Sequence, residues 1–282
     1  MQRIRKSGWT IPASGALGLL AVLCLAPASR AATLAGPVTW GSTDQPWGAR
    51  RAVTADDRTA IAAYRSGRKA PIFSTDFTSP AGFTADWSLE SDDNPTLKSC
   101  RRPDSVEASP AGLRLKTLVA GNCRTARWST GHAASKAKFG YGFYEARIKI
   151  ADIKGVNNAF WLTTDDNFGI DVTEATYPNY MHLGLQYWPH NGIEKHAGMG
   201  WGVSFVDNLS YGFHDIGLLW TSTGLVYEVD GEPVAAVETH GRVKGAAQIR
   251  FSTALGDWAG GKVPDHPEGH GMVVRSVRVF AP

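Results

Sequence analysis

Most of the chain after Pro71 alternates between apolar and polar residues instead of cycling with a helical period. The segment 142–150 is the clearest case, because charged residues separate its apolar positions Tyr144, Ala146, Ile148 and Ile150. The segment 181–188 alternates in the same way, with an apolar face formed by Met181, Leu183, Leu185 and Tyr187. A period of two is typical of strands that bury one face. The opposite face of each strand is where binding residues are expected.

Turn signals extend this all-β pattern to the end of the chain. Asp230-Gly231 follows the apolar run 225–229 and predicts a tight hairpin. The segment 273–280 is rich in β-branched residues and predicts a closing strand. No internal repeat is evident. The pattern predicts a sandwich of two antiparallel sheets.

One short helix is expected before the strands begin. Thr54 can act as its N-cap, with Asp57 at the capping-box position. Ile61 and Tyr64 share a face, and Gly67 ends the helix. The organisation predicted from these signals is a leader over 1–31, an N-terminal extension with a short helix over 32–70, and a sandwich domain over 71–282.

The first 31 residues have the layout of a secretory signal peptide. Basic Arg3, Arg5 and Lys6 precede an apolar stretch over 16–26, and small residues follow. A membrane anchor is the competing interpretation, but a span needs roughly 20 apolar residues. The sequence therefore predicts a secreted or periplasmic protein, without contact to a membrane after processing.

Charge limits the classes of partner. The chain has 29 basic and 26 acidic residues, and the leader holds four of the basic ones and none of the acidic ones. The remaining chain is close to neutral, which gives no electrostatic reason to bind nucleic acid or anionic lipid. At 43% hydrophobic and 20% charged residues, the composition is that of an ordinary globular protein. A monomer is expected.

Two cysteines remain outside the leader, Cys100 and Cys123. In an oxidising compartment such a pair most often forms one disulfide, worth roughly 3 kcal/mol on the loop-entropy model. A zinc site is the weaker interpretation, because no zinc-type spacing occurs. No cofactor is expected.

A cluster of carboxylates over 165–174 is the first sign of chemistry. Asp171 and Glu174 lie three residues apart, so a regular strand would point them to opposite faces. One bulged residue would bring both to the same face. Two carboxyl groups held together can divide into a proton donor and an ionised partner, as in glycosidases. An ordinary solvated acidic strand is the alternative that the spacing leaves open.

Several ordered motifs extend this observation over some 200 residues. They include Ser129-Thr130-Gly131, the run 139–147 (FGYGFYEAR), Ala159-Phe160-Trp161-Leu162, the run 169–174 (GIDVTE), Phe213-His214, Trp220, the run 227–231 (YEVDG), Gly256-Asp257-Trp258 and Val277-Arg278-Val279. Together they resemble glycoside hydrolase family 16. The resemblance implies a concanavalin-like jelly roll with a long cleft. It also implies an enzyme that cuts or rearranges internal β-linkages of polysaccharides with retention. It also leaves a structural calcium ion possible.

In that family the strand motif reads Glu-x-Asp-x-x-Glu in its bulged form. Glu174 matches the general acid/base and Asp171 matches the supporting carboxylate, whereas the nucleophile position is Gly169. A retaining glycosidase needs two carboxyl groups, one of which forms the covalent intermediate. Glycine provides none, so this position departs from the family's mechanism.

Three explanations of Gly169 follow. The chain is a sugar-binding relative without catalysis, or an enzyme from which the nucleophile was deliberately removed, or an enzyme that admits water into the vacated space. In the last case Asp171, Asp165 or Asp166 would serve as the base for inversion. A polysaccharide lyase is a further alternative, but it requires a basic cleft, and the near-zero charge gives it no support.

The resemblance also points to residues that contact the sugar. Asn157 and Trp161 share a strand face toward the cleft, and Asn157 stands where many relatives carry Trp. His182, Gln186 and Trp188 alternate on the polar face of the following strand. Packing is at least as good an interpretation for Trp220 and Trp258. His190, Glu194 and His196 lack metal spacing and are expected to be solvated.

Overall fold

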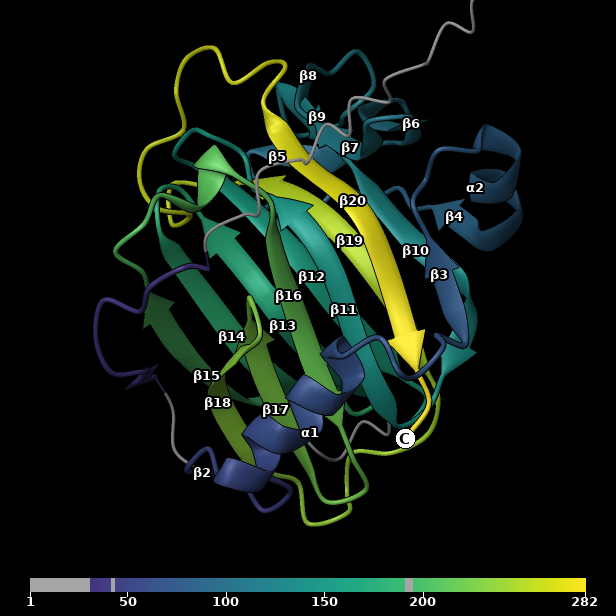
Figure 1. Cartoon of the computed structure of the whole chain (residues 1–282). Helices are drawn as coiled ribbons and strands as arrows, with labels where there is room; N and C mark the ends of the chain where they lie inside the picture. The colour runs from purple at the N-terminus through teal and green to yellow at the C-terminus, as the bar shows by residue number, and fades with distance from the viewer. Residues whose placement is uncertain (1–30, 42–43, 191–194) are drawn as a thin grey trace, which may run out of the picture.

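The structure is a computed structural model that describes residues 31–41, 44–190 and 195–282. Two large antiparallel sheets pack face to face, as Figure 1 shows. This is the predicted sandwich. The leader predicted over 1–31 lies, except for its last residue, outside the described residues.

The first large sheet is called the groove sheet, because its outer face carries the site described below. Its eight strands are, in spatial order, β1 (Thr39–Trp40), β15 (Ala197–Ser204), β14 (Tyr180–Tyr187), β13 (Phe168–Thr176), β12 (Val156–Thr164), β19 (Ala247–Leu255), β10 (His132–Phe139) and β4 (Trp87–Leu89).

The second large sheet is called the helix sheet, because helix α1 covers part of its outer face. Its order is β2 (Ala49–Arg51), β18 (Glu232–Glu238), β17 (Gly224–Val229), β16 (His214–Trp220), β11 (Gly142–Lys149), β20 (Gly271–Phe280), β7 (Gly112–Lys116) and β6 (Val106–Ser109), with β3 (Phe73–Thr75) pairing with β20. The predicted hairpin is present, since Asp230 and Gly231 join β17 to β18 with positive φ angles of 53° and 92°.

A small third sheet lies beside the sandwich and contains β5 (Ser99–Arg101), β9 (Trp128–Thr130) and β8 (Leu118–Val119). The predicted disulfide between Cys100 and Cys123 is present here, with a Cα–Cα distance of 5.7 Å. Two short 3₁₀ turns, Pro103–Ser105 and Leu209–Tyr211, complete the elements together with the two helices.

The inner faces of the two large sheets form the main core. Apolar residues from alternate positions of the strands are buried there, among them Tyr144, Ala146, Phe160, Leu183 and Phe251. Tyr187 packs against this core next to Phe168, as predicted. Trp220 is fully buried and donates its indole N–H to the Val243 carbonyl, so its role is packing.

Helix α1 (Ala55–Arg65) begins and ends close to the predicted positions. Thr54 and Asp57 form the capping box, and Gly67, just beyond the C-cap, has a left-handed φ of 74°. Ile61 and Tyr64 are buried against the outer face of the helix sheet. Figure 1 shows α1 lying across that face.

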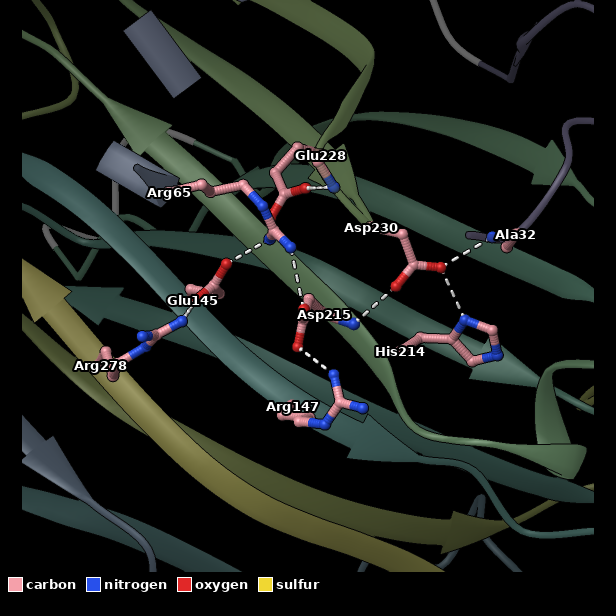
Figure 2. A network of polar contacts seen from close by, with 10 residues as sticks. Ala32, Arg65, Glu145, Arg147, His214, Asp215, Glu228, Asp230 and Arg278 are labelled. Atoms are coloured by element: carbon pink, nitrogen blue, oxygen red, sulfur yellow. Dashed lines mark hydrogen bonds and ion pairs between the residues drawn. The ribbon is translucent and has the colours of Figure 1, made fainter. Parts of the chain in front are cut away.

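A network of charges fixes the end of α1, and Figure 2 shows it from close by. The Arg65 guanidinium lies among three carboxylates, those of Glu145, Asp215 and Glu228. Arg278 and Arg147 pair with Glu145 and Asp215 from the other side. The side chain of Glu228 is completely buried, and burial raises its pKa to about 8.

A second helix, α2 (Pro80–Asp86), was not expected, because the pattern predicted only strands after Pro71. The signal was present in the sequence. Ser79 caps the helix by accepting from Gly82 N–H, and Pro80 occupies the first helical position, where it is well tolerated.

The predicted N-terminal extension is joined to the sandwich by main-chain pairing. Strand β1 pairs with β15 in the groove sheet, and β2 pairs with β18 in the helix sheet. Neither helix in the described part of the chain has the length and hydropathy that a membrane span requires.

Candidate active site

A β-bulge in β13 brings Asp171 and Glu174 to the same face of the groove sheet. On β12, Trp161 pairs with Asp171, and Ala159, two residues away, pairs with Glu174 three residues further along β13. The register against β14 shifts between the same two carboxylates. The predicted bulge is therefore confirmed, and it turns a spacing of three into a shared face.

These two carboxylates line a groove of about 550 Å³ on the outer face of the groove sheet. The groove also contains the predicted binding residues Asn157, Trp161, Gln186 and Trp188, and it is open at Gly169. A second cavity of about 540 Å³ adjoins it and contains His182, Tyr180 and the half-exposed Trp258. Glu174 lines both cavities, so the polar depression continues on either side of this carboxylate.

Glu174 is held by two predicted binding residues. Asn157 Nδ2 donates to Glu174 Oε1 at 2.7 Å, and His182 Nδ1 lies 3.3 Å from Glu174 Oε2. Burial by itself would raise the pKa of Glu174, but the hydrogen bonds from His182 and Asn157 hold it below its ordinary value. The same contact with Glu174 raises the pKa of His182. The pair therefore favours an ionised Glu174 next to a protonated imidazole.

The pKa of Asp171 shifts in the opposite direction to that of Glu174. Burial, followed by repulsion from the Glu174 carboxylate, raises the pKa of Asp171 to about 7. Its hydrogen bond with the Gln186 side chain lowers the pKa only in part. Below about pH 7 the free protein thus holds a proton on Asp171 while Glu174 is ionised, which divides the two carboxyl groups into a protonated and a charged member.

Gly169 leaves room for a side chain. A Cβ atom at this position would meet Trp188 Nε1 at 3.6 Å and Gln186 Cβ at 3.8 Å, which are ordinary van der Waals distances. Its φ is outside the left-handed region. The space next to Gly169 belongs to the groove and is not filled by packing.

The two tryptophans of the groove are held differently. Trp161 donates its indole N–H to Ser252 Oγ at 3.1 Å, and the Arg250 guanidinium lies 5.2 Å from its ring centroid. Trp188 is 52% exposed and stacks on His196, with centroids 3.7 Å apart. His196 is exposed, as expected, and it also takes part in this aromatic stack. His190 lines the groove, while Glu194 lies outside the described residues.

A row of glycines on β15 was missed in the sequence. Gly198, Gly200 and Gly202 alternate, and a Cβ at each would clash, in that order, with the side chains of Gln186, His182 and Tyr180 at 1.9 to 2.5 Å. These glycines let the side chains of β14 lie flat across β15. The alternation of glycine over 198–202 was the signal.

Arg101, Arg250 and His132 were also missed, although all three lie around Trp161 or in the groove. Arg101 lines the groove from β5. Arg250 pairs in register with Trp161, and the His132 ring lies 5.6 Å from the Trp161 ring. The strict alternation of 247–252, with Gln248, Arg250 and Ser252 on the polar face, was a usable signal.

The other acidic residues considered as bases lie elsewhere. Asp165 pairs with Lys138, and Asp166 accepts from Thr164 Oγ1 and from Lys244 N–H. Neither carboxylate lines the groove. Of these three acidic residues, Asp171 is the one that lines the groove together with Glu174 and Gly169.

Within the described residues, one group has the spacing of a metal site, formed by Asp93, Cys100 and Cys123. Its two cysteines form the disulfide, so their sulfurs are not available as thiolate ligands. The structural calcium ion stays a prediction.

Comparison with known proteins identifies the family and the fold. The sequence profile of glycosyl hydrolases family 16 matches residues 103–273. The chain belongs to this family. A solved structure, LamAcat from Zobellia galactanivorans, superposes with a TM-score of 0.66 at 16% identity, covering 77% of this chain and 99% of that one. The shared jelly roll is the predicted concanavalin-like fold.

Relatives are also found by sequence. An endo-1,3-1,4-beta-glycanase, ExoK of Rhizobium meliloti, is 26% identical over 160 residues, which are 53% of this chain and 57% of that protein. A Bacteroides ovatus mixed linkage glucan family 16 structure, solved with a G4G4G3G product, has a TM-score of 0.62 at 18% identity and covers 74% of this chain and all of that one. This chain spans 38% to 57% of the length of the curated relatives it matches.

Proposed function

We propose that this family 16 protein is an exported, endo-acting glycosidase that hydrolyses internal β-linkages of a polysaccharide. The observation that supports it most is the bulge that gathers Asp171 and Glu174 in a groove that continues past Glu174 on both sides. A groove of this kind suits a long chain bound across the site. The related endo-glycanases act on the same broad class of substrate, as their names state.

In the proposed reaction, water takes the place of the missing nucleophile. A water molecule in the space beside Gly169 attacks the anomeric carbon and gives its proton to Asp171. The glycosidic bond breaks, and the leaving oxygen takes a proton from Glu174. This route inverts the anomeric centre, because a single displacement occurs without a covalent sugar intermediate.

His182 supplies the proton that Glu174 needs. In the free protein Glu174 is the ionised carboxyl group, so it must receive a proton before it acts as an acid. The protonated His182 ring lies 3.3 Å from Glu174 Oε2 and can transfer that proton. Asp171 must lose its own proton to serve as the base.

The second candidate is a carbohydrate-binding relative without turnover. The specific observation in its favour is Gly169, because it removes the carboxylate on which the retaining mechanism depends. A pure binder, however, has no chemical need for Asp171 and Glu174 to share one face of the groove.

Turnover and its stereochemistry test the proposal. Purified protein is incubated with laminarin, lichenan, agarose and carrageenan, reducing ends are measured, and NMR identifies the first anomer released. We expect inversion on one substrate and a loss of about 10² to 10⁴-fold in Glu174→Gln. The control Glu107→Gln changes the same group at an exposed position of the helix sheet and should leave turnover unchanged. Full activity in Glu174→Gln would contradict its role as the acid.

Gly169→Glu tests the vacated position. The space beside Gly169 accepts a Cβ without a clash, so the new carboxylate should point into the groove. We expect hydrolysis to rise by about tenfold or more, with a change from inversion to retention. External azide or formate should likewise increase turnover of an activated glycoside in the wild type. If neither change affects any glycan, and none binds, the groove is not a sugar site.

The pH profile tests the roles of Asp171 and His182. Activity should rise as Asp171 loses its proton, near its pKa of about 7, and fall again as His182 deprotonates above its ordinary value. His182→Gln removes the proton source, so it should lower kcat most at the optimum, where His182 is protonated, and should abolish the alkaline limb that its titration produces. An unchanged alkaline limb in His182→Gln would contradict the proton transfer.

A further inference from the structure

Two guanidinium groups lie around Trp161, one that lines the groove and one beside the Trp161 ring, in a region called the groove wall. Arg101 lines the groove together with Trp161 and Glu174, and it comes from β5 of the small third sheet. Arg250 lies beside Trp161 on the neighbouring strand β19. The nearly neutral charge of the chain gave no indication of this local concentration of positive charge.

The Arg250 guanidinium contacts only neutral groups. It donates to Thr163 Oγ1 at 3.0 Å and to Gln248 Oε1 at 2.6 Å, and its Nη1 lies 3.3 Å from His132 Nε2. In the described part of the chain, Arg250 forms no ion pair within 4.0 Å; Glu90 is the acid that acts on it most strongly from a distance. Burial lowers the pKa of Arg250, so its charge is held at an energetic cost that Glu90 offsets only in part.

His132 is a buried, neutral ring that lies next to Arg250. Arginine can only donate, so His132 Nε2 accepts from Arg250 and the ring's proton is on Nδ1. Burial, with further contributions from Arg101 and Arg250, lowers the pKa of His132 to about 3, and the ring stays neutral. Its exposed fraction is 5%, and Nδ1 has no acceptor among the described residues. A buried N–H without an acceptor is uncommon and costly.

The hydrogen bonds of the Arg101 side chain are likewise only partly formed within the described structure. It pairs with Asp92 through one Nη1 contact of 2.9 Å, but its buried Nε–H has no acceptor among the residues that the structure describes. The position of Arg101 is fixed by its neighbour Cys100, whose disulfide lies in the same small sheet, and by main-chain bonds between residues 92 and 101. The backbone at Arg101 is thus fixed, and its side chain lies at the groove.

We propose that this wall recognises an anionic substituent of the polysaccharide, a carboxylate or a sulfate ester, with Arg101 as its principal contact and Arg250 as the second charge. This inference rests on the proposed function, because it names the substrate class of the same groove. A planar guanidinium binds carboxylate and sulfate through paired hydrogen bonds, and Arg101 presents a buried Nε–H without an acceptor among the described residues at the edge of the groove. Trp161, beside Arg250, provides an apolar surface for the sugar ring.

The test compares glycans that share a backbone and differ in charge. Laminarin, lichenan and agarose are each used unmodified, oxidised at the primary hydroxyls to carboxylates, and sulfated, and binding is measured by affinity electrophoresis and calorimetry. We expect at least one carboxylated or sulfated form to bind about tenfold to hundredfold more tightly than its neutral parent, with a preference that weakens in salt. Comparison of the carboxylated and sulfated forms identifies the group that is recognised.

Three variants locate the effect. Arg101→Gln should abolish the preference for the charged form, and Arg101→Lys, which keeps the charge but not the planar fork, should restore part of it. The control Arg58→Gln removes one charge from an exposed position of α1 on the helix sheet and should keep the full preference. Thermal unfolding verifies that each variant is folded.

The outcomes separate this inference from the proposed function. Equal binding of charged and neutral forms, or a preference that survives in Arg101→Gln, overturns the inference and leaves the glycosidase proposal intact. Absence of binding to every glycan overturns both. Preference for an anionic form together with an unsaturated, ultraviolet-absorbing product would support the inference but show that cleavage is elimination and not hydrolysis.

Discussion

Two groups of arginines in this molecule serve opposite purposes. On the outer face of the helix sheet, Arg65 lies among Glu145, Asp215 and Glu228, as Figure 2 shows, and every cation there faces a carboxylate. On the groove wall, Arg250 has only neutral partners, and Arg101 has one acid and a buried N–H without an acceptor in the described structure.

A structural charge is compensated by opposing charges within the protein, whereas a charge available to a ligand is not fully compensated. In the Arg65 network the opposing charges compensate one another, and the arrangement ties α1 to the sheet. At the groove wall the desolvation of the arginines is only partly compensated within the protein. In the proposed complex, a negatively charged group of the ligand supplies the compensation that the protein lacks.

The largest expected effect separates the two groups by stability. Arg65→Met removes the central cation and leaves Glu145 and Glu228 buried without it, so we expect a loss of about 3 to 5 kcal/mol in the free energy of unfolding. Urea denaturation measures the loss. The control Arg68→Met, at an exposed position just beyond the same helix, should change stability by less than about 0.5 kcal/mol. Equal small losses in both variants would show that the network does not anchor α1.

A smaller effect concerns the pH dependence of that network. The pKa of Glu228 is raised to about 8 in the folded protein, so the folded state holds a proton that the unfolded state releases near its ordinary pKa of 4.5. The contribution of Glu228 to stability is therefore present at low pH and is lost as pH rises through 8. Glu228→Gln should remove this decline, which is at most about 1.4 kcal/mol per pH unit.

Denaturation of wild type and Glu228→Gln at pH 5, 6.5 and 8 measures that difference. The stability of the wild type relative to the variant should fall over this range. A difference that is constant with pH would mean that Glu228 is ionised in the folded protein throughout.

The smallest expected effect is at the groove wall. Arg250→Met removes a half-buried cation whose partners are neutral and, at Thr163 and Gln248, can bond to water instead. We expect a change of less than about 1 kcal/mol in unfolding free energy, in either direction, together with weaker binding of anionic glycan. A loss as large as that of Arg65→Met would show that Arg250 is a structural residue, like Arg65, and that the two groups of arginines do not differ in this respect.

Local signals in the sequence predicted a large part of the fold and of the site. The capping residues Thr54 and Asp57 marked the start of α1, and strict alternation marked β11 and β14. The spacing of Asp171 and Glu174 required a bulge if both were to share a face, and the bulge is present. Each of these features depends on residues that are close together in the chain.

Contacts between distant segments could not be predicted in this way. Arg101 lies 70 residues before Asp171 in the chain and reaches the groove from the small third sheet, and nothing around Arg101 in the sequence indicates where that sheet lies. The contact of His132 with Arg250 likewise joins strands 118 residues apart. The absence of an acceptor for His132 Nδ1 among the described residues depends on everything that packs around it.

The sequence by itself determined the class of fold, the two carboxylates, the glycine at position 169 and the cysteine pair, because periodicity, spacing and residue identity are local properties. The tertiary structure alone decided which charges are compensated and which remain open. That depends on distances and burial between strands brought together by the two sheets, since the energy of a charge is set by every group around it in space.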